Sequence, residues 1–298
     1  MLDRLRSDYV FFLAGFGSEY SLQPIAHYLA EHDFSFVVAD MQQAPLPPPP
    51  LKATVFITSQ HPSCSSAAFR IHTQETPPFS NYMSPLEIIH QLRPACSVFV
   101  PHDLEAPIRP YEFSYMSAFD IYCAPSAEVN PALRHLCKVI PAGWVKHHHF
   151  DVLAADIKTM VESNGMFFLN QVVSLMRAGG ASFVRDNYPA IFAAKLPVKL
   201  PAWPGCEVMA DELRQMGATV LATETNSTKL IAASPRIYVN ATGSVIAEAN
   251  YVGTPVILAG KAGEPDQLLI AAGSDQTRPE FDFNRLLTAV AAHIEETT

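Results

Sequence analysis

The turn Asn240-Ala241-Thr242-Gly243-Ser244 joins the apolar run 236–239 to the helical pattern 245–251. The run has the length of a buried strand, so the turn presents small hydroxyl residues and a glycine at the amino end of a helix. Free N–H groups and the helix dipole favour phosphate at such an end. Glu248 lies one helical turn after Ser244, where its carboxylate can accept hydrogen bonds from a ribose diol. These residues predict a nucleotide site, although a plain helix cap by the turn, with the glutamate in solvent, explains the same spacing.

A histidine followed by an aspartate provides the best candidate for a general base. His102 closes the predicted strand 97–100, and the carboxylate of Asp103 can orient the imidazole and raise its basicity. His61 comes after the predicted strand 53–58 and is the second candidate on the same sheet edge. Either histidine can also be an uncommitted surface or capping residue.

Two glycines come after the first predicted strand, residues 9–14. Gly15 and Gly17 can bring the backbone close to a bound phosphate, or they can simply allow a tight turn. Position 20 is Tyr, so the Gly-x-Gly-x-x-Gly spacing of a dinucleotide site is not met.

The elements that position these residues alternate between short apolar strands and helical patterns, which is typical of doubly wound parallel sheets. Strands are expected at 9–14, 35–39, 53–58, 97–100, 120–124, 138–140, 166–169, 197–200, 218–222, 236–239 and 255–258. Helices are expected at 22–29, 85–92, 188–194, 210–216, 228–233, 245–251 and 283–295, the last with the apolar spacing of a docked terminal helix.

The length of 298 residues suits two α/β cores better than one. A boundary near Ala155 gives Rossmann-like domains over 1–155 and 156–298. Ligands bind outside the carboxyl ends of parallel strands, so we expect the two sheets to face a common cleft.

The composition narrows the class of protein. Apolar residues make up 49% and charged residues 16% of the chain, as in a globular protein, and a formal charge of −9 argues against broad contact with nucleic acid. The charged start and the early glycines exclude a signal peptide, and no apolar run reaches the ~18 residues of a membrane span. Five scattered cysteines suit a reducing compartment. A cytoplasmic protein is expected, with weak membrane association left open.

Metal binding is not expected from the sequence. His147-His148-His149 are consecutive, so they cannot all point at one ion from a regular element. We interpret this segment as a solvated linker, and we predict neither a metal nor another cofactor.

The turn and the helix after it resemble a known segment. Ala241-Thr242-Gly243-Ser244, then Glu248-Ala249 and Gly253-Thr254-Pro255-Val256-Ile257, are similar to the late donor-binding segment of GT-B-fold glycosyltransferases and UDP-N-acetylglucosamine 2-epimerases. The similarity is greatest to bacterial capsule and teichoic-acid transferases, including the CDP-glycerol, Kdo and polysialic acid enzymes. The resemblance implies that Thr242, Gly243 and Ser244 hold the donor phosphates and that Glu248 holds the ribose.

One feature of the capsule families is missing. They carry a His-Pro pair after an earlier strand of the second domain, where this chain has Val198-Lys199-Leu200-Pro201. Lys199 can supply a positive charge to phosphate instead, or it can be an ordinary surface lysine.

The resemblance implies a metal-independent glycosyltransferase that moves a sugar or polyol phosphate from a nucleotide-activated donor to a glycan or other hydroxyl acceptor. The process would be bacterial surface glycan or glycoconjugate synthesis, with 1–155 as acceptor domain and 156–298 as donor domain. Two alternatives stay open. One is a nucleotide-sugar epimerase using Asp103, Glu105 and Glu128, and the other is a non-catalytic protein of this fold that binds a nucleotide, sugar or protein partner.

Overall fold

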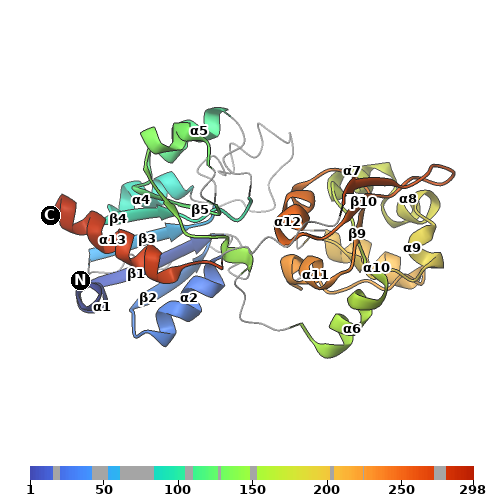
Figure 1. Cartoon of the computed structure of the whole chain (residues 1–298), viewed down its shortest axis with the longest axis horizontal. Helices are drawn as coiled ribbons and strands as arrows, with labels where there is room; N and C mark the ends of the chain where they lie inside the picture. Colours follow the sequence, from blue (N-terminus) through green and yellow to red (C-terminus); the bar gives the residue numbers. More distant parts are fainter. Residues whose placement is uncertain are drawn as a thin grey trace. The chain divides into compact units, whose positions relative to one another are not determined.

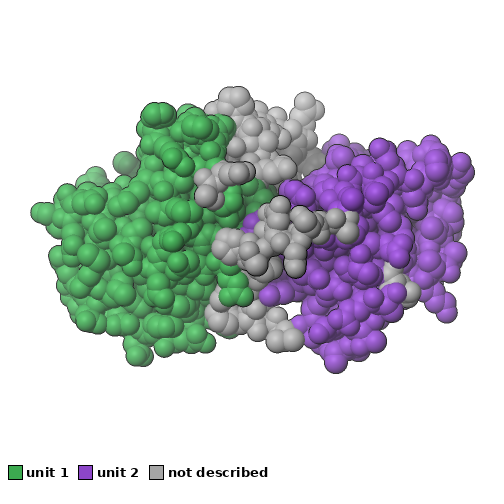
Figure 2. All heavy atoms as spheres, viewed as in Figure 1, with its two compact units in different colours: residues 1–150, 279–298 green, residues 151–278 purple. Residues whose placement is uncertain are grey.

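The chain forms two compact units, coloured in Figure 2. Unit 1 comprises Met1–Phe150 and Pro279–Thr298, and unit 2 comprises Asp151–Arg278. The computed structural model describes residues 1–15, 21–41, 53–60, 84–104, 110–126, 129–147, 153–201, 205–223, 225–271 and 280–298. The division lies close to the boundary expected near Ala155. The structure differs from the expectation for the last twenty residues, which belong to unit 1 rather than to the second domain.

Unit 1 is built on a six-stranded parallel sheet with the order β2-β1-β3-β4-β5-β6. The strands are β1 (Tyr9–Gly15), β2 (Phe36–Asp40), β3 (Ala53–Thr58), β4 (Cys96–Phe99), β5 (Ile121–Ala124) and β6 (Lys138–Pro141). The chain first moves outward from β1 to β2 and then returns to place β3 on the other side of β1. This reversal is the switch point of a doubly wound sheet, and ligands bind beside it.

Helices cover both faces of this sheet (Figure 1). One face carries α1 (Leu2–Asp8), α2 (Leu22–Glu31) and α13 (Phe283–Thr297), and the other carries α4 (Pro85–Leu92), α5 (Pro110–Met116) and the 3-10 helix η1 (Pro131–His135). Side chains alternate along β1: Leu13 points into the first core, and Phe12 points into the second. The strand is therefore buried on both faces, which explains its unbroken apolar run.

The final helix returns to unit 1 because of its apolar stripe. Leu286, Val290 and Ile294 are at most 2% exposed and pack in the same core as the strand residues of β1, β3, β4 and β5. The helix docks as its spacing predicts, and its partner is the first sheet.

Unit 2 contains a five-stranded sheet with the order β11-β10-β9-β7-β8. The strands are β7 (Met166–Phe168), β8 (Val198–Lys199), β9 (Ile237–Val239), β10 (Val256–Leu258) and β11 (Gln267–Ile270). The pairings are parallel except for β10 with β11. The switch point lies between β7 and β9, because β8 is added on one side of β7 and β9 on the other. The strand expected at 218–222 is reduced to one bridge between Val198 and Val220.

The helices of unit 2 also lie on both faces of its sheet (Figure 1). The core around Phe167 includes residues of α7 (Val172–Ala178), α8 (Gly180–Asn187), α9 (Ala190–Ala193) and α10 (Cys206–Gln215), whereas the core around Phe168 includes residues of α6 (Ala155–Asn164), α11 (Ser227–Ala233) and α12 (Ser244–Val252). The predicted fold class, two doubly wound α/β domains, is confirmed for each unit by itself. Among the described helices, none has the length and apolar character needed to cross a membrane.

We predict that Leu286→Ala destabilises unit 1 by roughly 2–5 kcal/mol, because the truncated side chain leaves a cavity in a packed core. Leu286 is 1% exposed, whereas Leu268 of unit 2 is 62% exposed and provides the matched control. Urea denaturation of the full chain measures both variants, and Leu268→Ala is expected to stay within about 0.5 kcal/mol of the wild type. Equal effects of the two substitutions would contradict the docking of α13.

Candidate functional site

The turn Asn240–Ser244 lies at the carboxyl end of β9 and leads into α12. The helix has Gly243 at its N-cap position, without a side-chain capping bond, and Thr242, Gly243 and Ser244 are exposed. The helix-cap interpretation of Thr242 and Ser244 is therefore wrong. The amino end of α12 keeps N–H groups available to a ligand at the surface of unit 2.

Two asparagines join the loops after β7 and β9. The side-chain oxygen of Asn240 accepts a bond from the Asn170 backbone N–H at 2.6 Å, and its amide donates to the Asn170 carbonyl at 3.1 Å. In return, the Asn170 amide donates to the Ala241 carbonyl at 2.9 Å. These bonds fix the turn at the switch point. Asn170 is not among the residues predicted from sequence, although its position directly after a strand is the signal by which the others were chosen.

Glu248 lies inside unit 2 rather than in solvent. Its side chain is 4% exposed, and its Oε2 accepts a bond from Thr228 Oγ1 at 3.2 Å. The solvated alternative for this residue is wrong. Its carboxylate is held between α12 and α11, one helical turn below Ser244.

Lys199 is also buried, at 1% exposure, so the surface-lysine alternative is wrong. Its Nζ donates to the carbonyls of Leu200 and Thr223, each at 2.6 Å. The ammonium group therefore links the end of β8 to the loop around Thr223, whose hydroxyl in turn donates to Glu207. Two carbonyl oxygens of the protein are thus among its direct partners.

In unit 1, His102 and Asp103 come after β4. His102 Nδ1 lies 2.8 Å from the Ser59 carbonyl, which can only accept, so Nδ1 carries the proton and the neutral ring keeps its lone pair on Nε2. Nε2 lies 3.4 Å from Asp103 Oδ2. A proton taken up at Nε2 would thus be stabilised by the carboxylate, as a general base requires. The His102 side chain is 38% exposed, so a substrate can reach it.

A lysine extends this pair. Lys146 Nζ lies 4.0 Å from Asp103 Oδ1 and 5.8 Å above the ring of the buried Trp144. Asp103 therefore stands between an imidazole and an ammonium group. Lys146 is absent from the residues predicted by sequence because it lies several positions beyond the end of β6, rather than directly after a strand.

Gly15 ends β1 at the switch point of unit 1. A Cβ atom added there would lie 2.8 Å from Leu22 Cδ1 and 3.3 Å from Ser59 Oγ, so a larger residue would displace the Leu22 side chain. Gly15 therefore lies next to Ser59, the residue whose carbonyl faces His102 Nδ1. Gly17, His61, Glu105 and Glu128 lie outside the described residues, as do His148 and His149 of the histidine run.

Unit 2 also has a cavity of 320 Å³ on the sheet face of Phe167 and Tyr238. Its lining includes Arg236 and Asp266 but none of the residues from Asn240 to Ser244. The candidate nucleotide site is therefore an exposed turn and helix end, and it does not coincide with this cavity.

Comparisons with known proteins give structural neighbours only. No family model matches the chain, and no curated protein matches it. The wall teichoic acid polymerase TagF is similar over 99% of this chain and 84% of its own, with 11% identity and a TM-score of 0.48. The UDP-GlcNAc 2-epimerase of Neisseria meningitidis, solved with UDP-GlcNAc, is similar over 97% of this chain and 92% of its own, with 12% identity and a TM-score of 0.37. The glycosyltransferase SnogD of Streptomyces nogalater is similar over 84% of this chain and 80% of its own, with 12% identity and a TM-score of 0.40.

These neighbours are the kinds of protein that the sequence resemblance names: glycosyltransferases, an epimerase and a teichoic acid polymerase. Low identity and TM-scores below 0.5 leave donor, acceptor and reaction to be argued from the residues of this chain.

We predict that Asn240→Ala lowers the free energy of unfolding by about 1–3 kcal/mol, because backbone groups of Asn170 lose their partners. Gln215→Ala, at an exposed position of α10, serves as the control. Urea denaturation compares the two variants. A loss no larger for Asn240→Ala than for Gln215→Ala would show that the asparagine pair does not fix the turn.

Proposed function

We propose that this protein is a glycosyltransferase that takes a sugar or polyol phosphate from a nucleotide-activated donor held by unit 2. The observation that supports this best is the uncapped amino end of α12, fixed at the switch point of unit 2 by the Asn170–Asn240 bonds. A doubly wound sheet binds its ligand at such a point, and a helix amino end there favours phosphate.

The donor contacts are set by the local geometry. The N–H groups at the start of α12 and the hydroxyl groups of Thr242 and Ser244 bind the diphosphate. The carboxylate of Glu248, one helical turn further, accepts from the ribose hydroxyls. It is buried and already has a hydroxyl partner in Thr228, so the ribose needs to reach only its remaining lone pairs. Lys199 holds the end of β8 and the loop around Thr223 together through backbone carbonyls.

Acceptor activation belongs to unit 1 in this proposal. His102 takes the proton of the acceptor hydroxyl at Nε2, and Asp103 stabilises the imidazolium that forms. Lys146 helps to hold the aspartate in place by its own positive charge. The dipole of α12 stabilises the leaving group, which is a nucleoside diphosphate when a sugar is transferred and a nucleoside monophosphate when a polyol phosphate is transferred, so the transfer runs without an essential metal ion.

The same geometry favours transfer over epimerisation. An epimerase of the kind considered would use Asp103 as an acid or base, but this carboxylate is engaged by His102 and Lys146. The imidazole of His102 beside it is 38% exposed and accepts the proton at Nε2 in this proposal. We further propose that the acceptor is a bacterial surface glycan precursor or glycoconjugate and that the reaction takes place in the cytoplasm, where unbridged thiols such as Cys123 and Cys137 stay reduced.

We predict that one of UDP, CDP, GDP and ADP raises the Tm of the protein, since a ligand at a hundred times its Kd adds about 2.7 kcal/mol of stability. Ser244→Asp is expected to abolish this shift, because its charge repels the phosphate. The same charge interacts favourably with the helix dipole, so the unliganded variant should remain at least as stable as the wild type.

Gln267→Glu, which adds a negative charge on the exposed edge strand β11, provides the matched control and should keep the nucleotide shift. If none of the four nucleotides stabilises the wild type, the donor site is refuted. A shift that survives Ser244→Asp would place the nucleotide elsewhere.

We predict that His102→Gln lowers turnover by about 10²–10⁴-fold, the usual contribution of a general base. The glutamine amide can still donate to the Ser59 carbonyl, so the local fold should persist. Nucleoside diphosphate release from the matching nucleotide sugar measures turnover, with water or a glycan library as acceptor. The nucleotide-induced Tm shift should be unchanged, because the donor contacts lie in unit 2.

The exposed His90 of α4 supplies the comparison, and His90→Gln should retain full turnover. Unchanged turnover in His102→Gln would remove His102 as the base while leaving the donor site intact.

A further inference from the structure

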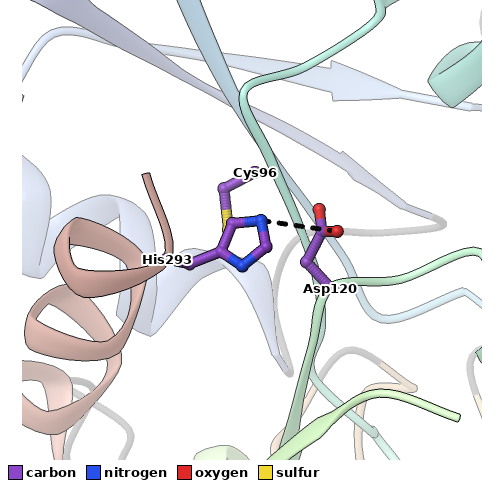
Figure 3. Close-up of side chains that lie close together, drawn as sticks. All are labelled: Cys96, Asp120 and His293. Carbon is purple, nitrogen blue, oxygen red and sulfur yellow. Dashed lines mark ion pairs between the residues drawn. The ribbon is translucent and has the colours of Figure 1, made fainter. Parts of the chain in front are cut away.

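Three side chains of unit 1 that can ligate metal converge at the amino ends of two neighbouring strands (Figure 3). Cys96 is the first residue of β4, Asp120 directly precedes β5, and His293 projects from α13. One ligand atom from each lies within 4.8 Å of the others. The cluster is at the opposite ends of the strands from His102, so the proposed transfer reaction does not use it.

The spacing is close to that of a zinc site. Bonds of about 2.0–2.3 Å in tetrahedral geometry place neighbouring ligand atoms about 3.3–3.7 Å apart. His293 Nε2 and Asp120 Oδ1 are already 3.4 Å apart. The cysteine sulfur lies within 4.8 Å of both, so a side-chain shift of about 1 Å brings the three to the spacing of one ion.

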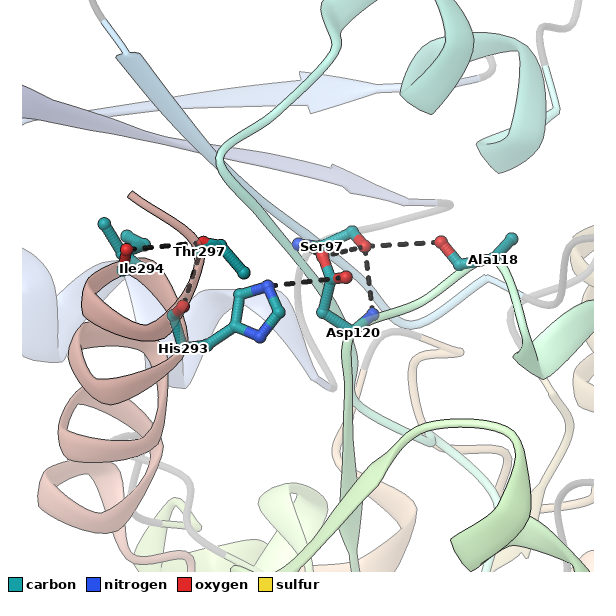
Figure 4. Close-up of polar contacts among 6 residues, drawn as sticks. All are labelled: Ser97, Ala118, Asp120, His293, Ile294 and Thr297. Atoms are coloured by element: carbon teal, nitrogen blue, oxygen red, sulfur yellow. Dashed lines mark hydrogen bonds and ion pairs between the residues drawn. The ribbon is translucent and has the colours of Figure 1, made fainter.

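Surrounding bonds hold the aspartate in position (Figure 4). Asp120 Oδ2 accepts from the Ser97 backbone N–H at 2.7 Å and from Ser97 Oγ at 2.8 Å, which leaves Oδ1 directed to the histidine. The last turn of α13 is tied by Thr297 Oγ1, which donates to the His293 carbonyl at 2.9 Å. The Ser97 bonds to the Asp120 carboxylate are of the kind that orients ligands in metal sites.

The burial of Cys96 favours a role as a metal ligand over a role as a nucleophile. Cys96 is 0% exposed, so no substrate can reach its sulfur, whereas the side chains of Asp120 and His293 are 37% and 18% exposed. An ion therefore has a path to the cluster from the solvent side. Burial, followed by the charge of Asp120, raises the pKa of the Cys96 thiol, so zinc must displace the thiol proton as it binds.

We propose that Cys96, Asp120 and His293 bind one zinc ion, with water as the fourth ligand. A thiolate and an imidazole select zinc over magnesium and calcium, which prefer oxygen ligands. The ion links α13 to the amino ends of β4 and β5, and so fastens the end of the chain to the sheet of unit 1.

Metal analysis of the full chain tests the site. After removal of metal with a chelator and dialysis against zinc, elemental analysis should find about one zinc per chain, and excess magnesium should not displace it. Zinc should raise the Tm of the wild type. Cys96→Ser and His293→Ala should lose both the bound zinc and the shift.

Cys123→Ser is the matched control, because Cys123 is equally buried in the same core and outside the cluster. It should retain the zinc. Ser97→Ala should weaken zinc binding by about 10-fold or more, since it removes an outer bond to Asp120.

Cobalt binding tests the site in the wild type alone, so this test does not depend on whether a variant folds. Cobalt bound to the wild type should show the visible and near-ultraviolet absorption of a thiolate ligand. A wild-type chain that takes up no zinc, or cobalt without thiolate absorption, would overturn the proposal. Zinc retained by a folded Cys96→Ser variant would overturn it as well, leaving an ion pair of His293 and Asp120 beside a core thiol.

Discussion

The reversal of strand order in each doubly wound sheet is the constraint on which the candidate sites depend. Adjacent parallel strands need a connection that crosses back, and where successive connections leave in opposite directions their loops separate at the carboxyl edge. In unit 1 this point lies between β1 and β3, and in unit 2 between β7 and β9. Gly15 and Ser59 flank the first point, and Asn170 and Asn240 flank the second. The turn at Asn240 therefore lies at the second point itself, whereas His102, which follows the neighbouring strand β4, reaches the first point through the Ser59 carbonyl.

Most strands of the sheets could be predicted from sequence because they are buried on both faces. β1 forms an unbroken apolar run, β3 has the apolar residues 55–57 between two threonines, and both strands appear at nearly the expected bounds. The helices α7 and α8 were missed because Gly179 and Gly180 indicate a loop, whereas the structure uses them to join two short helices. The expected strand 218–222 makes a single bridge, since β8 has only two residues to pair with. Whether such a segment becomes a strand depends on the neighbouring strand with which it pairs, and the local sequence pattern does not contain that information.

The same limit applies to the candidate site, where local sequence features could be predicted and contacts between distant residues could not. The sequence identifies the turn after β9 and the His102-Asp103 pair because each comes directly after a strand. It does not reveal that Lys199 turns inward to the Thr223 carbonyl or that Glu248 is buried against Thr228, because each of these partners lies at least twenty residues away along the chain. It also gives no sign of Lys146, which contacts Asp103 from beyond the end of β6. The sequence thus identifies polar residues that come just after strands, but it does not reveal the contacts that determine their roles.

The two edges of the unit 1 sheet offer different chemistry for a physical reason. At the carboxyl edge the His102 side chain is 38% exposed, and a proton taken up at its Nε2 would face the Asp103 carboxylate, which is the arrangement that the proposed proton transfer uses. At the amino edge the Cys96 sulfur is buried, and α13, at the end of the chain, packs against the sheet. This arrangement suits a fixed link between the helix and the sheet. A zinc ion there would act on the docking of α13, and the apolar stripe of that helix already supplies most of the contact. The ion would then add to the stability of unit 1 without taking part in the reaction at the other edge.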